Sequence, residues 1–439
     1  MKNKINLIAG SLSGILLVCG VFIYNGTYKD FIQGKSNVVT IGVFSDSYWE
    51  VQNGYSYHIL EDAIKLFEEN NPGIKVEYTS GILKKDYSEW LSAQILSENA
   101  PDVFYVLADD FNNFAETGVL EDLSLYIEKD KDFNIDAFYS SAYAYGQYNG
   151  KQYCLPYECA PKLMFVNKTI LDNEGLEVPD KDWTWDDLYS ICEKVTKDTD
   201  GNGTVDQFGV IGYTWKEAFE SEGINLFNRN GTECYFTDAG IGKALSFIEK
   251  LENINSGYNA GSKDFDLGNV VFQPMSFSDY RAYKPYPLSV KKYTGFEWGC
   301  IPMPAGPDGD NISTLDTLFI AINEKSRNKK AAWELVKALA YNTEIQSEIF
   351  NYSEGVSVLK DVTESEQTLG QMMDGNSLDL AILSNIVEEA VVVPRFGNYE
   401  EAVAQVEQAV TAIIEDGYNI SMGQIIWNRK INKYLKNSK

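Results

Sequence analysis

Apolar and polar residues change their spacing repeatedly along this chain, and the changes predict strands that alternate with helices. Residues Asn37–Ser45 (NVVTIGVFS) alternate and are rich in β-branched side chains, which predicts a first strand. Residues Tyr57–Asn70 repeat apolar side chains at helical spacing, and Pro72 and Gly73 directly afterwards end a helix. The same reasoning predicts a strand over Ile74–Tyr78, a helix over Asp86–Glu98 and a strand over Asp102–Ala108.

This order of strand and helix is typical of parallel βαβ units with right-handed crossovers. In such sheets, ligands bind beyond the carboxyl ends of the strands. Two segments occupy that position, Asp46–Glu50 (DSYWE) and Asp109–Phe111 (DDF). Both are therefore candidate binding segments.

The rest of the chain is richer in helical patterns. They predict helices over Trp185–Lys197, Asp238–Ile254, Asn328–Tyr341, Thr343–Phe350 and, as the last long helix, Tyr399–Glu415. Strands are predicted over Val270–Phe272 and Thr317–Ile322, with an irregular aromatic loop (SFSDYRAYKPYP) after the first of them. The proline-rich Cys300–Asn311 breaks regular structure and predicts a crossover between lobes.

Length and charge narrow the choice of function. A chain of 439 residues is too long for one ordinary core, which predicts two lobes. A formal net charge of −27 excludes nucleic acid as a partner and disfavours anionic ligands. The chain also has 28 Tyr and 8 Trp, enough to stack against flat apolar faces as well as to fill cores.

The first residues predict a targeting or anchoring segment. Lys2 and Lys4 precede an apolar run over Ile5–Tyr24, which is long enough to span a bilayer if it is not cleaved. Lipidation at Cys19, an uncleaved anchor and clean secretion all stay open, and each places the mature domain outside the cytoplasm. We therefore assign residues 1–37 to an anchor and tether.

Cysteine and histidine usage argues against several kinds of site. Cys154 and Cys159 are close enough in sequence to pair if the chain between them bends, or they are buried thiols. No CxxC pair indicates zinc, and the one histidine, His58, is expected to pack or cap a helix. The chain therefore has too few histidines for a histidine-based catalytic triad or a His-rich metal site.

One loop has the spacing of a calcium site. In KDTDGNGTVDQFG, oxygen ligands recur at alternate positions and Gly203 occupies the sharp turn. The predicted ligands are Asp198, Asp200, Asn202, the Thr204 carbonyl and Asp206. Gly209 stands where a sensor loop has a bidentate glutamate, so we expect a structural calcium ion rather than a switch.

Several segments, in the same order, resemble one family. They include APDVFYVLADDFNNFAETGVLEDLSLYI (Ala100–Ile127), YNGKQYCLPYECAPKLMFVNKTIL (Tyr148–Leu171), WTWDDLYSICEKVT (Trp183–Thr196) and the block from Ile301 through AAWELVKALA (Ala331–Ala340). They resemble the extracellular solute-binding proteins of ATP-driven importers, family 1, the sugar type that includes maltose-binding protein. Val166 replaces the usual tyrosine of the hinge strand.

The resemblance implies an α/β, two-lobed, periplasmic-binding-protein-like fold of type II. Each lobe is expected to be a mostly parallel sheet flanked by helices, with crossing strands as the hinge. We expect the N-terminal lobe to comprise residues 38–158 and 314–365, and the C-terminal lobe residues 159–313 and 366–439. A monomer that docks on the transmembrane subunits of a permease is also implied.

The resemblance also implies ligand-binding positions. Asp109 falls at the tip where maltose-type members bond sugar hydroxyls, although Asp110 replaces their arginine and Val106 an upstream tryptophan. Trp49 is expected to supply an aromatic platform instead. The remaining candidates are Asp46, Glu50, Tyr157, Glu158, Phe277, Tyr280, Arg281, Trp298, Arg395 and Tyr399.

These features favour non-enzymatic capture of a neutral carbohydrate, most simply an oligosaccharide, because aromatic faces bury its C–H faces and polar groups bind its rim. A secreted glycoside hydrolase with paired carboxylates such as Asp109 and Glu158 is the alternative from another class. Binding of a peptide, polyamine or metal, and a sensing rather than a transport role, also stay open.

Overall fold

The computed structural model describes residues 37–49, 57–255, 258, 260–283, 295–368 and 378–437, and the structural statements below concern these residues. Residues 1–36 of the predicted anchor and tether (residues 1–37), with Cys19, and the candidate Glu50 lie outside the described residues.

The N-terminal strands and helices form the predicted βαβ units. β1 (Val38–Gly42) lies between β2 (Lys75–Tyr78) and β3 (Val103–Val106) and pairs parallel with both. α2 (His58–Asn70) connects β1 to β2, and α3 (Lys84–Leu96) connects β2 to β3. Each of these predicted elements is therefore confirmed, with ends that differ by a few residues.

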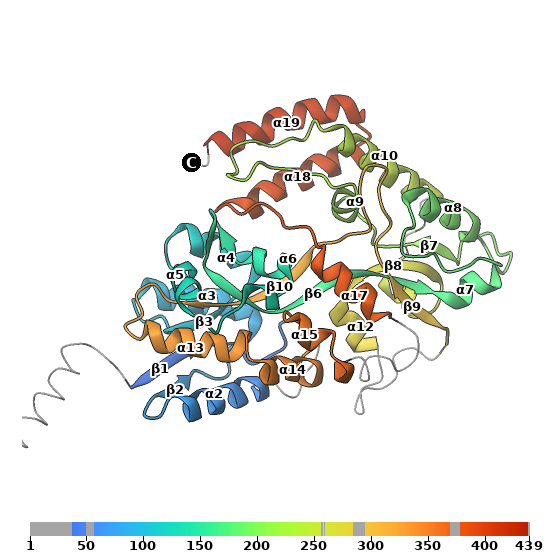
Figure 1. Cartoon of the computed structure of the whole chain (residues 1–439). Coiled ribbons are helices and arrows are strands. Elements are labelled where there is room, and N and C mark those ends of the chain that lie inside the picture. The colour runs from blue at the N-terminus through green and yellow to red at the C-terminus, as the bar shows by residue number, and fades with distance from the viewer. Residues whose placement is uncertain are drawn as a thin grey trace, which may run out of the picture.

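One long strand joins the two halves of the molecule. β6 (Cys154–Asn167) pairs through its first part with β10 (Leu315–Ile322) and through its second part with β8 (Val270–Ser276). The sheet order is β2-β1-β3-β10-β6-β8-β7, and β6 runs across the middle of the molecule (Figure 1). Pairs on β6 are antiparallel, whereas β7 (Phe208–Val210) and β8 are parallel, so the predicted α/β class is confirmed with mixed pairing.

Buried apolar residues form two clusters on either side of this strand. The first surrounds β1, β3 and β10 and is covered by α2, α13 (Lys329–Ala340) and α14 (Thr343–Tyr352). The second lies among α8 (Trp185–Val195), α10 (Ala239–Ile254), β8 and α18 (Tyr399–Ile414). The predicted lobe boundaries stay a prediction, although α17 (Leu380–Glu388), which we assigned to the second lobe, packs in the first cluster.

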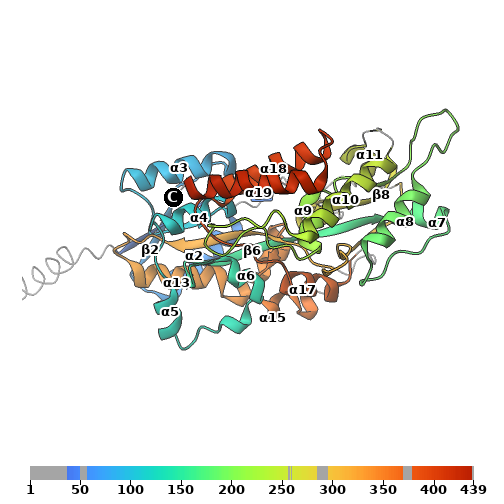
Figure 2. The same cartoon turned by 90° about the horizontal axis from the view of Figure 1, so that it is seen from above.

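The remaining elements complete the architecture. They are α4 (Ala108–Glu116), α5 (Ser124–Lys129), a 3₁₀ turn (Ile135–Ala137), α6 (Ser140–Tyr145), β4 (Gln147–Tyr148), β5 (Lys151–Gln152), α7 (Lys168–Asn173), α9 (Trp215–Ser221), α11 (Ser262–Asp266), α12 (Phe277–Tyr283), β9 (Trp298–Ile301), β11 (Val356–Ser357), α15 (Lys360–Thr363) and α19 (Ile420–Asn437). α18 and α19 lie side by side along one face (Figure 1 and Figure 2). Within the described residues, no helix combines the length and hydrophobicity that a membrane span requires.

Two sequence predictions of secondary structure are wrong. The aromatic segment after β8 is not an irregular loop but begins with α12, because Ser276 and Asp279 form a reciprocal cap. The Ser276 N–H donates to Asp279 Oδ2 (3.0 Å), and the Asp279 N–H donates to Ser276 Oγ (3.2 Å). The helix over Tyr399–Ile414 is also not the last one, since α19 follows it.

The two neighbouring cysteines are separate thiols. Cys154 and Cys159 are buried and form no disulfide, and burial raises the pKa of both. Both lie in the extended strand β6, where five residues span roughly 16 Å, far beyond disulfide reach. The alternative of buried thiols is therefore the one the structure supports.

Candidate ligand-binding cleft

A cleft lies between elements of the two hydrophobic clusters. One wall comes from the first turn of α4 and the end of α6, and the opposite wall comes from α9. The start of β10, residues 391–395 and the first turns of α18 complete it. Its empty volume is about 1120 Å³, including space open to solvent.

The first wall presents one carboxylate to the cleft and turns its neighbour away. Asp109 is exposed in the first turn of α4 and lines the cleft, where the helix N-terminus favours a negative charge. Asp110 Oδ2 instead accepts a hydrogen bond from Ser88 Oγ (2.6 Å), and burial raises the pKa of Asp110. Only Asp109 of this pair lines the cleft.

The opposite wall contains residues that sequence reasoning missed. Trp215, Lys216 and Glu220 all lie on α9, shortly after the carboxyl end of β7. Trp215 Nε1 donates to Glu407 Oε2 (3.0 Å), which fixes the indole ring. The signal was present: Thr214 and Glu217 have the spacing of a capping box, and their side chains cap α9.

Arg395 lies in the cleft between two aromatic rings. Its guanidinium carbon is 5.3 Å from the ring centre of Phe111 and 4.9 Å from that of Tyr145. The Nε atom is buried and has no hydrogen-bond partner among the described residues, and burial lowers the pKa of the guanidinium. Since a buried donor without a partner is costly, this N–H is available to a bound molecule.

The charges around the cleft nearly balance. Carboxylates from Asp109, Glu220 and Glu400 face the cations of Lys216 and Arg395. Burial raises the pKa of both glutamates. The aromatic and aliphatic part of the lining includes Trp215, Phe219, Phe227, Leu315, Pro394 and Tyr399. Rings together with balanced polar groups suit an uncharged guest that carries many hydroxyls.

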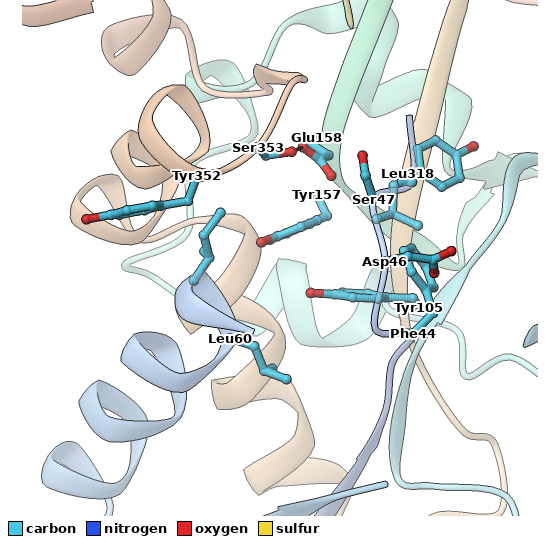
Figure 3. A pocket seen from close by; sticks show the side chains of 12 residues that line it. Phe44, Asp46, Ser47, Leu60, Tyr105, Tyr157, Glu158, Leu318, Tyr352 and Ser353 are labelled. Carbon is cyan, nitrogen blue, oxygen red and sulfur yellow. Dashed lines mark hydrogen bonds between the residues drawn. The ribbon is translucent and has the colours of Figure 1, made fainter. Parts of the chain in front are cut away.

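Other predicted binding residues lie in a separate, smaller pocket, which we call the inner pocket (Figure 3). Tyr105 and Tyr157 stack there, with ring centres 5.2 Å apart. Ser353 Oγ donates to Glu158 Oε2 (2.5 Å), and burial raises the pKa of Glu158 to about 7. Tyr157 and Glu158 therefore already interact with neighbouring side chains.

The first candidate segment contributes to the inner pocket rather than to the cleft. Asp46 Oδ1 accepts a hydrogen bond from the Lys84 N–H (2.6 Å) at the start of α3. Trp49 is only 8% exposed, and its ring packs edge-on against Tyr48 (4.6 Å). Trp49 is not among the residues that line the cleft, so the predicted platform lies outside it.

The aromatic candidates of the second half pack together near β6. Phe277 and Tyr280 are fully buried and stack on each other, and Trp298 stacks on Phe165 (5.6 Å). Arg281 donates to the Phe350 carbonyl (2.7 Å) at the end of α14. These four candidates therefore lie outside the cleft lining, whereas Asp109, Arg395 and Tyr399 belong to it.

The loop after α8 brings the predicted calcium ligands together. Carboxylate oxygens of Asp198, Asp200 and Asp206 lie within 4.8 Å of one another. Asp198 accepts the Gly203 N–H (2.6 Å) and the Gly201 N–H (2.8 Å), and the bond from Gly203 is the main cause that lowers its pKa. Asn202 Oδ1 accepts the Thr204 N–H (2.8 Å). Such a set of oxygen ligands fits Ca²⁺.

Packing explains the glycine at the end of this loop. A Cβ atom at Gly209 would lie 2.5 Å from the Cα and Cβ atoms of Cys192 on α8. A glutamate at this position would therefore disrupt the contact between β7 and α8. The loop cannot close on a bidentate carboxylate from residue 209.

Comparison with known proteins points to one family. The family model described as bacterial extracellular solute-binding protein matches residues 51–343, well over half of the chain. A binding protein of Brucella abortus is 22% identical over 378 residues, which cover 80% of this chain and 84% of that protein. The maltotriose-binding protein of Pyrococcus abyssi is 24% identical over 345 residues, which cover 76% of this chain and 70% of that protein.

A solved structure has the same architecture. The cyclic α-maltosyl-1,6-maltose binding protein of Arthrobacter globiformis superposes with a TM-score of 0.75 at 16% identity, covering 91% of this chain and 99% of the other. At this identity the likeness shows the two-lobed α/β fold and does not by itself identify a ligand.

Proposed function

This chain belongs to the bacterial extracellular solute-binding proteins, a family of binding proteins, and from this premise we propose that it captures a carbohydrate. The guest is a neutral sugar, most simply an oligosaccharide, held in the cleft between the lobes and delivered to the transmembrane subunits of an ABC permease. The maltotriose-binding and cyclic maltosyl-maltose-binding relatives support this class of ligand.

The observation that supports the proposal most strongly is the unsatisfied hydrogen-bond donor of Arg395. Its buried Nε–H has no partner among the described residues, and Arg395 lines a cleft that also contains Asp109, Glu220 and Trp215. A sugar hydroxyl satisfies this donor without bringing a charge into the cleft. Carboxylates accept hydroxyl donors on the same guest, and rings cover its C–H faces.

Capture requires movement but no bond-making step. Ligand shifts the lobes toward a closed state only by the contacts that it makes in that state and not in the open one. The monomeric protein therefore acts as a carrier. Isothermal titration calorimetry against a panel of neutral oligosaccharides tests this: we expect binding tighter than millimolar, and a panel without any such binder would overturn it. Release of reducing sugar over hours would instead establish the hydrolase alternative.

We also propose that Ca²⁺ binds Asp198, Asp200, Asn202, the Thr204 carbonyl and Asp206 as a structural ion. An ion bound only by the folded state adds about 3–4 kcal/mol when its concentration is 100 to 1,000 times the dissociation constant. Calcium should raise the melting temperature of the wild-type protein and fail to do so for Asp198→Asn. An equal calcium response in both proteins would refute the site.

We further propose that residues 1–37 tether the protein to the outer face of the cytoplasmic membrane, through a lipidated Cys19 or an uncleaved anchor. Membrane fractionation and fatty-acid labelling of the full chain and of Cys19→Ser separate the routes. Incorporation of a labelled fatty acid into the wild-type chain but not into the variant indicates lipidation, membrane retention without label indicates the anchor, and a wild-type protein found only in the medium contradicts both.

A further inference from the structure

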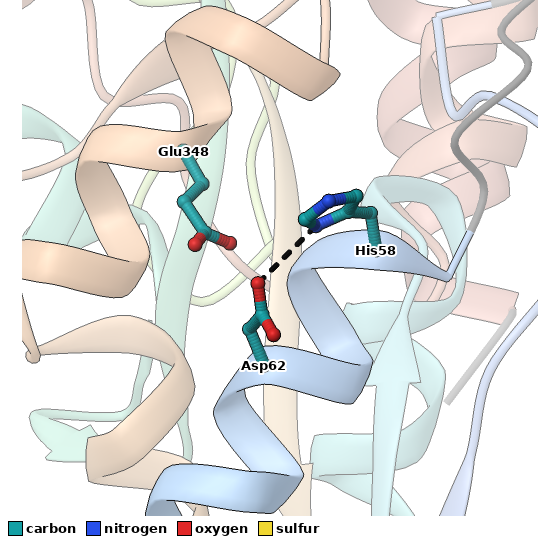
Figure 4. Close-up of side chains that lie close together, drawn as sticks. All are labelled: His58, Asp62 and Glu348. Atoms are coloured by element: carbon teal, nitrogen blue, oxygen red, sulfur yellow. Dashed lines mark ion pairs between the residues drawn. The ribbon is translucent and has the colours of Figure 1, made fainter.

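Three potential metal ligands from two helices meet on the surface of the first hydrophobic cluster. His58 and Asp62 lie one turn apart on α2, and Glu348 lies on α14. One ligand atom from each of the three side chains lies within 4.8 Å of the other two. The side chains point toward one another across the gap between the helices (Figure 4).

Local structure holds these side chains in place. The i,i+4 spacing puts His58 and Asp62 on the same face of α2, and His58 Nδ1 is 3.3 Å from Asp62 Oδ2. The imidazole ring stacks on Tyr352 (3.9 Å between ring centres, 14° between planes), which fixes the orientation of its nitrogens. The ligand geometry is therefore defined before any ion binds.

The cluster also contains an oxygen that has no partner. Glu348 Oε2 is buried and forms no hydrogen bond, and it faces the carboxylate of Asp62. Among the described residues, neither carboxylate forms an ion pair with a lysine or arginine. Two carboxylates so close repel each other unless one of them keeps a proton or a cation lies between them. A cation at this position would satisfy the oxygen and relieve the repulsion.

We propose that His58, Asp62 and Glu348 bind a divalent transition-metal ion of the zinc type. One imidazole nitrogen and two carboxylate oxygens make a ligand set that zinc accepts, with water in the remaining position. Calcium and magnesium prefer oxygen ligands alone, so this site differs in chemistry from the loop at Asp198. Both side-chain groups on α2 are about 40% exposed, which leaves the site open to ions from solution.

Bound metal would cross-link α2 to α14. The far end of α14 is held by Arg281, which donates to the Phe350 carbonyl, and by Ser353, which donates to Glu158 on β6. The ion would therefore stabilise the first lobe where it meets the strand that joins the two halves. It is separate from the cleft, and the proposal does not depend on which sugar binds there.

The test uses zinc alone, added to the metal-free full chain without a histidine tag and with calcium in excess so that the loop at Asp198 is filled. We expect one zinc per chain by calorimetry and a rise in the melting temperature. In His58→Ala and in Glu348→Gln, the affinity for zinc should fall at least about tenfold, and the rise in melting temperature should be smaller. Glu69→Gln and Glu344→Gln, exposed positions on the same two helices, are matched controls that should bind zinc normally.

A second measurement needs no substitution. Because the chain has a single histidine, its imidazole NMR resonances report on this site alone. They should shift on addition of zinc, and Co²⁺ in place of zinc should give visible absorption bands. No zinc binding to the wild-type chain, unshifted imidazole resonances, or equal affinity in the variants and the controls would each overturn the proposal.

Discussion

The cleft and the inner pocket contain similar side chains but differ in whether those side chains already have partners. In the inner pocket, Glu158 accepts from Ser353 and Tyr157 stacks on Tyr105. In the cleft, Asp109 is exposed and the Nε–H of Arg395 is without a partner among the described residues. Side chains therefore bond one another in the inner pocket, whereas the cleft keeps an exposed carboxylate and an unsatisfied donor.

The comparison shows which property separates a binding residue from a structural one. Residue type and position after a strand are the same for Trp49 and Trp215, yet only Trp215 lines the cleft. Both indoles are buried, so what differs is the surface that each ring adjoins, which long-range contacts determine. Substitutions in the two regions should accordingly change different quantities, stability in the inner pocket and affinity in the cleft.

Trp49→Ala should have the largest effect, and it should act on stability. Removing a buried indole leaves a cavity, and such changes cost about 3–5 kcal/mol. Urea denaturation should show this loss, while sugar affinity of the folded protein changes little. Trp49→Phe, which keeps most of the buried area, is the milder control. If Trp49→Ala lost sugar affinity but kept its unfolding free energy, Trp49 would belong to the ligand site. The cleft and the inner pocket would then not differ in the way described above.

Glu158→Gln should change how stability depends on pH. Burial raises the folded-state pKa of Glu158 to about 7, above its value in the unfolded chain, so the native state binds the proton more tightly. The stability that this carboxyl contributes is fully present below about pH 4.5 and is lost as pH rises through about 7, a change of roughly 3 kcal/mol.

Urea denaturation of the wild-type protein and of Glu158→Gln between pH 4.5 and 8 measures this. The neutral amide should remove the part of the dependence that Glu158 contributes, so the difference in stability between the two proteins should grow with pH in favour of the variant. Glu69→Gln, on the exposed face of α2, should leave the wild-type profile unchanged. A constant difference between wild type and Glu158→Gln would contradict a buried, protonated carboxyl.

Local patterns predicted most of the elements of the fold. The segments Tyr57–Asn70 and Asp102–Ala108 have strong periodicity, and α2 and β3 form there. The reciprocal cap of Ser276 and Asp279 was overlooked because the aromatic residues around it dominate the pattern. α19 was missed although its apolar residues recur at helical spacing about as regularly as those of α14, which was predicted. Mixed pairing around β6 depends on contacts between distant segments, which no local pattern encodes.

The candidate site could be predicted only in part. Asp109, Arg395 and Tyr399 follow from position after a strand or at a helix start, and the structure places them in the cleft lining. Glu220 is absent from the sequence prediction because its role depends on α9 lying opposite α4 across the cleft. The burial of Phe277 likewise follows from packing on β6, which composition does not reveal.

Arg395→Met should reduce affinity without reducing stability. A hydrogen bond from a charged donor contributes about 1.5–3 kcal/mol, so affinity for the sugar identified by calorimetry should fall roughly 10- to 100-fold. Methionine fits between the rings of Phe111 and Tyr145, and the buried charge disappears, so the unfolding free energy should stay equal or rise. Arg429→Met, at an exposed position on α19, should change neither quantity. Unchanged affinity in Arg395→Met would move the ligand away from the cleft.

The smallest effect gives the sharpest contrast, because it compares two adjacent carboxylates on one helix. Asp109→Asn removes a charge-assisted acceptor that lines the cleft, and sugar affinity should fall about 5- to 10-fold, near 1 kcal/mol. Asp110→Asn should leave affinity intact, because Asp110 bonds Ser88 and is turned away from the cleft lining. Calorimetry measures the sugar affinity of both variants. Equal losses would mean that the charge of the α4 N-terminus, rather than direct contact by Asp109, attracts the ligand.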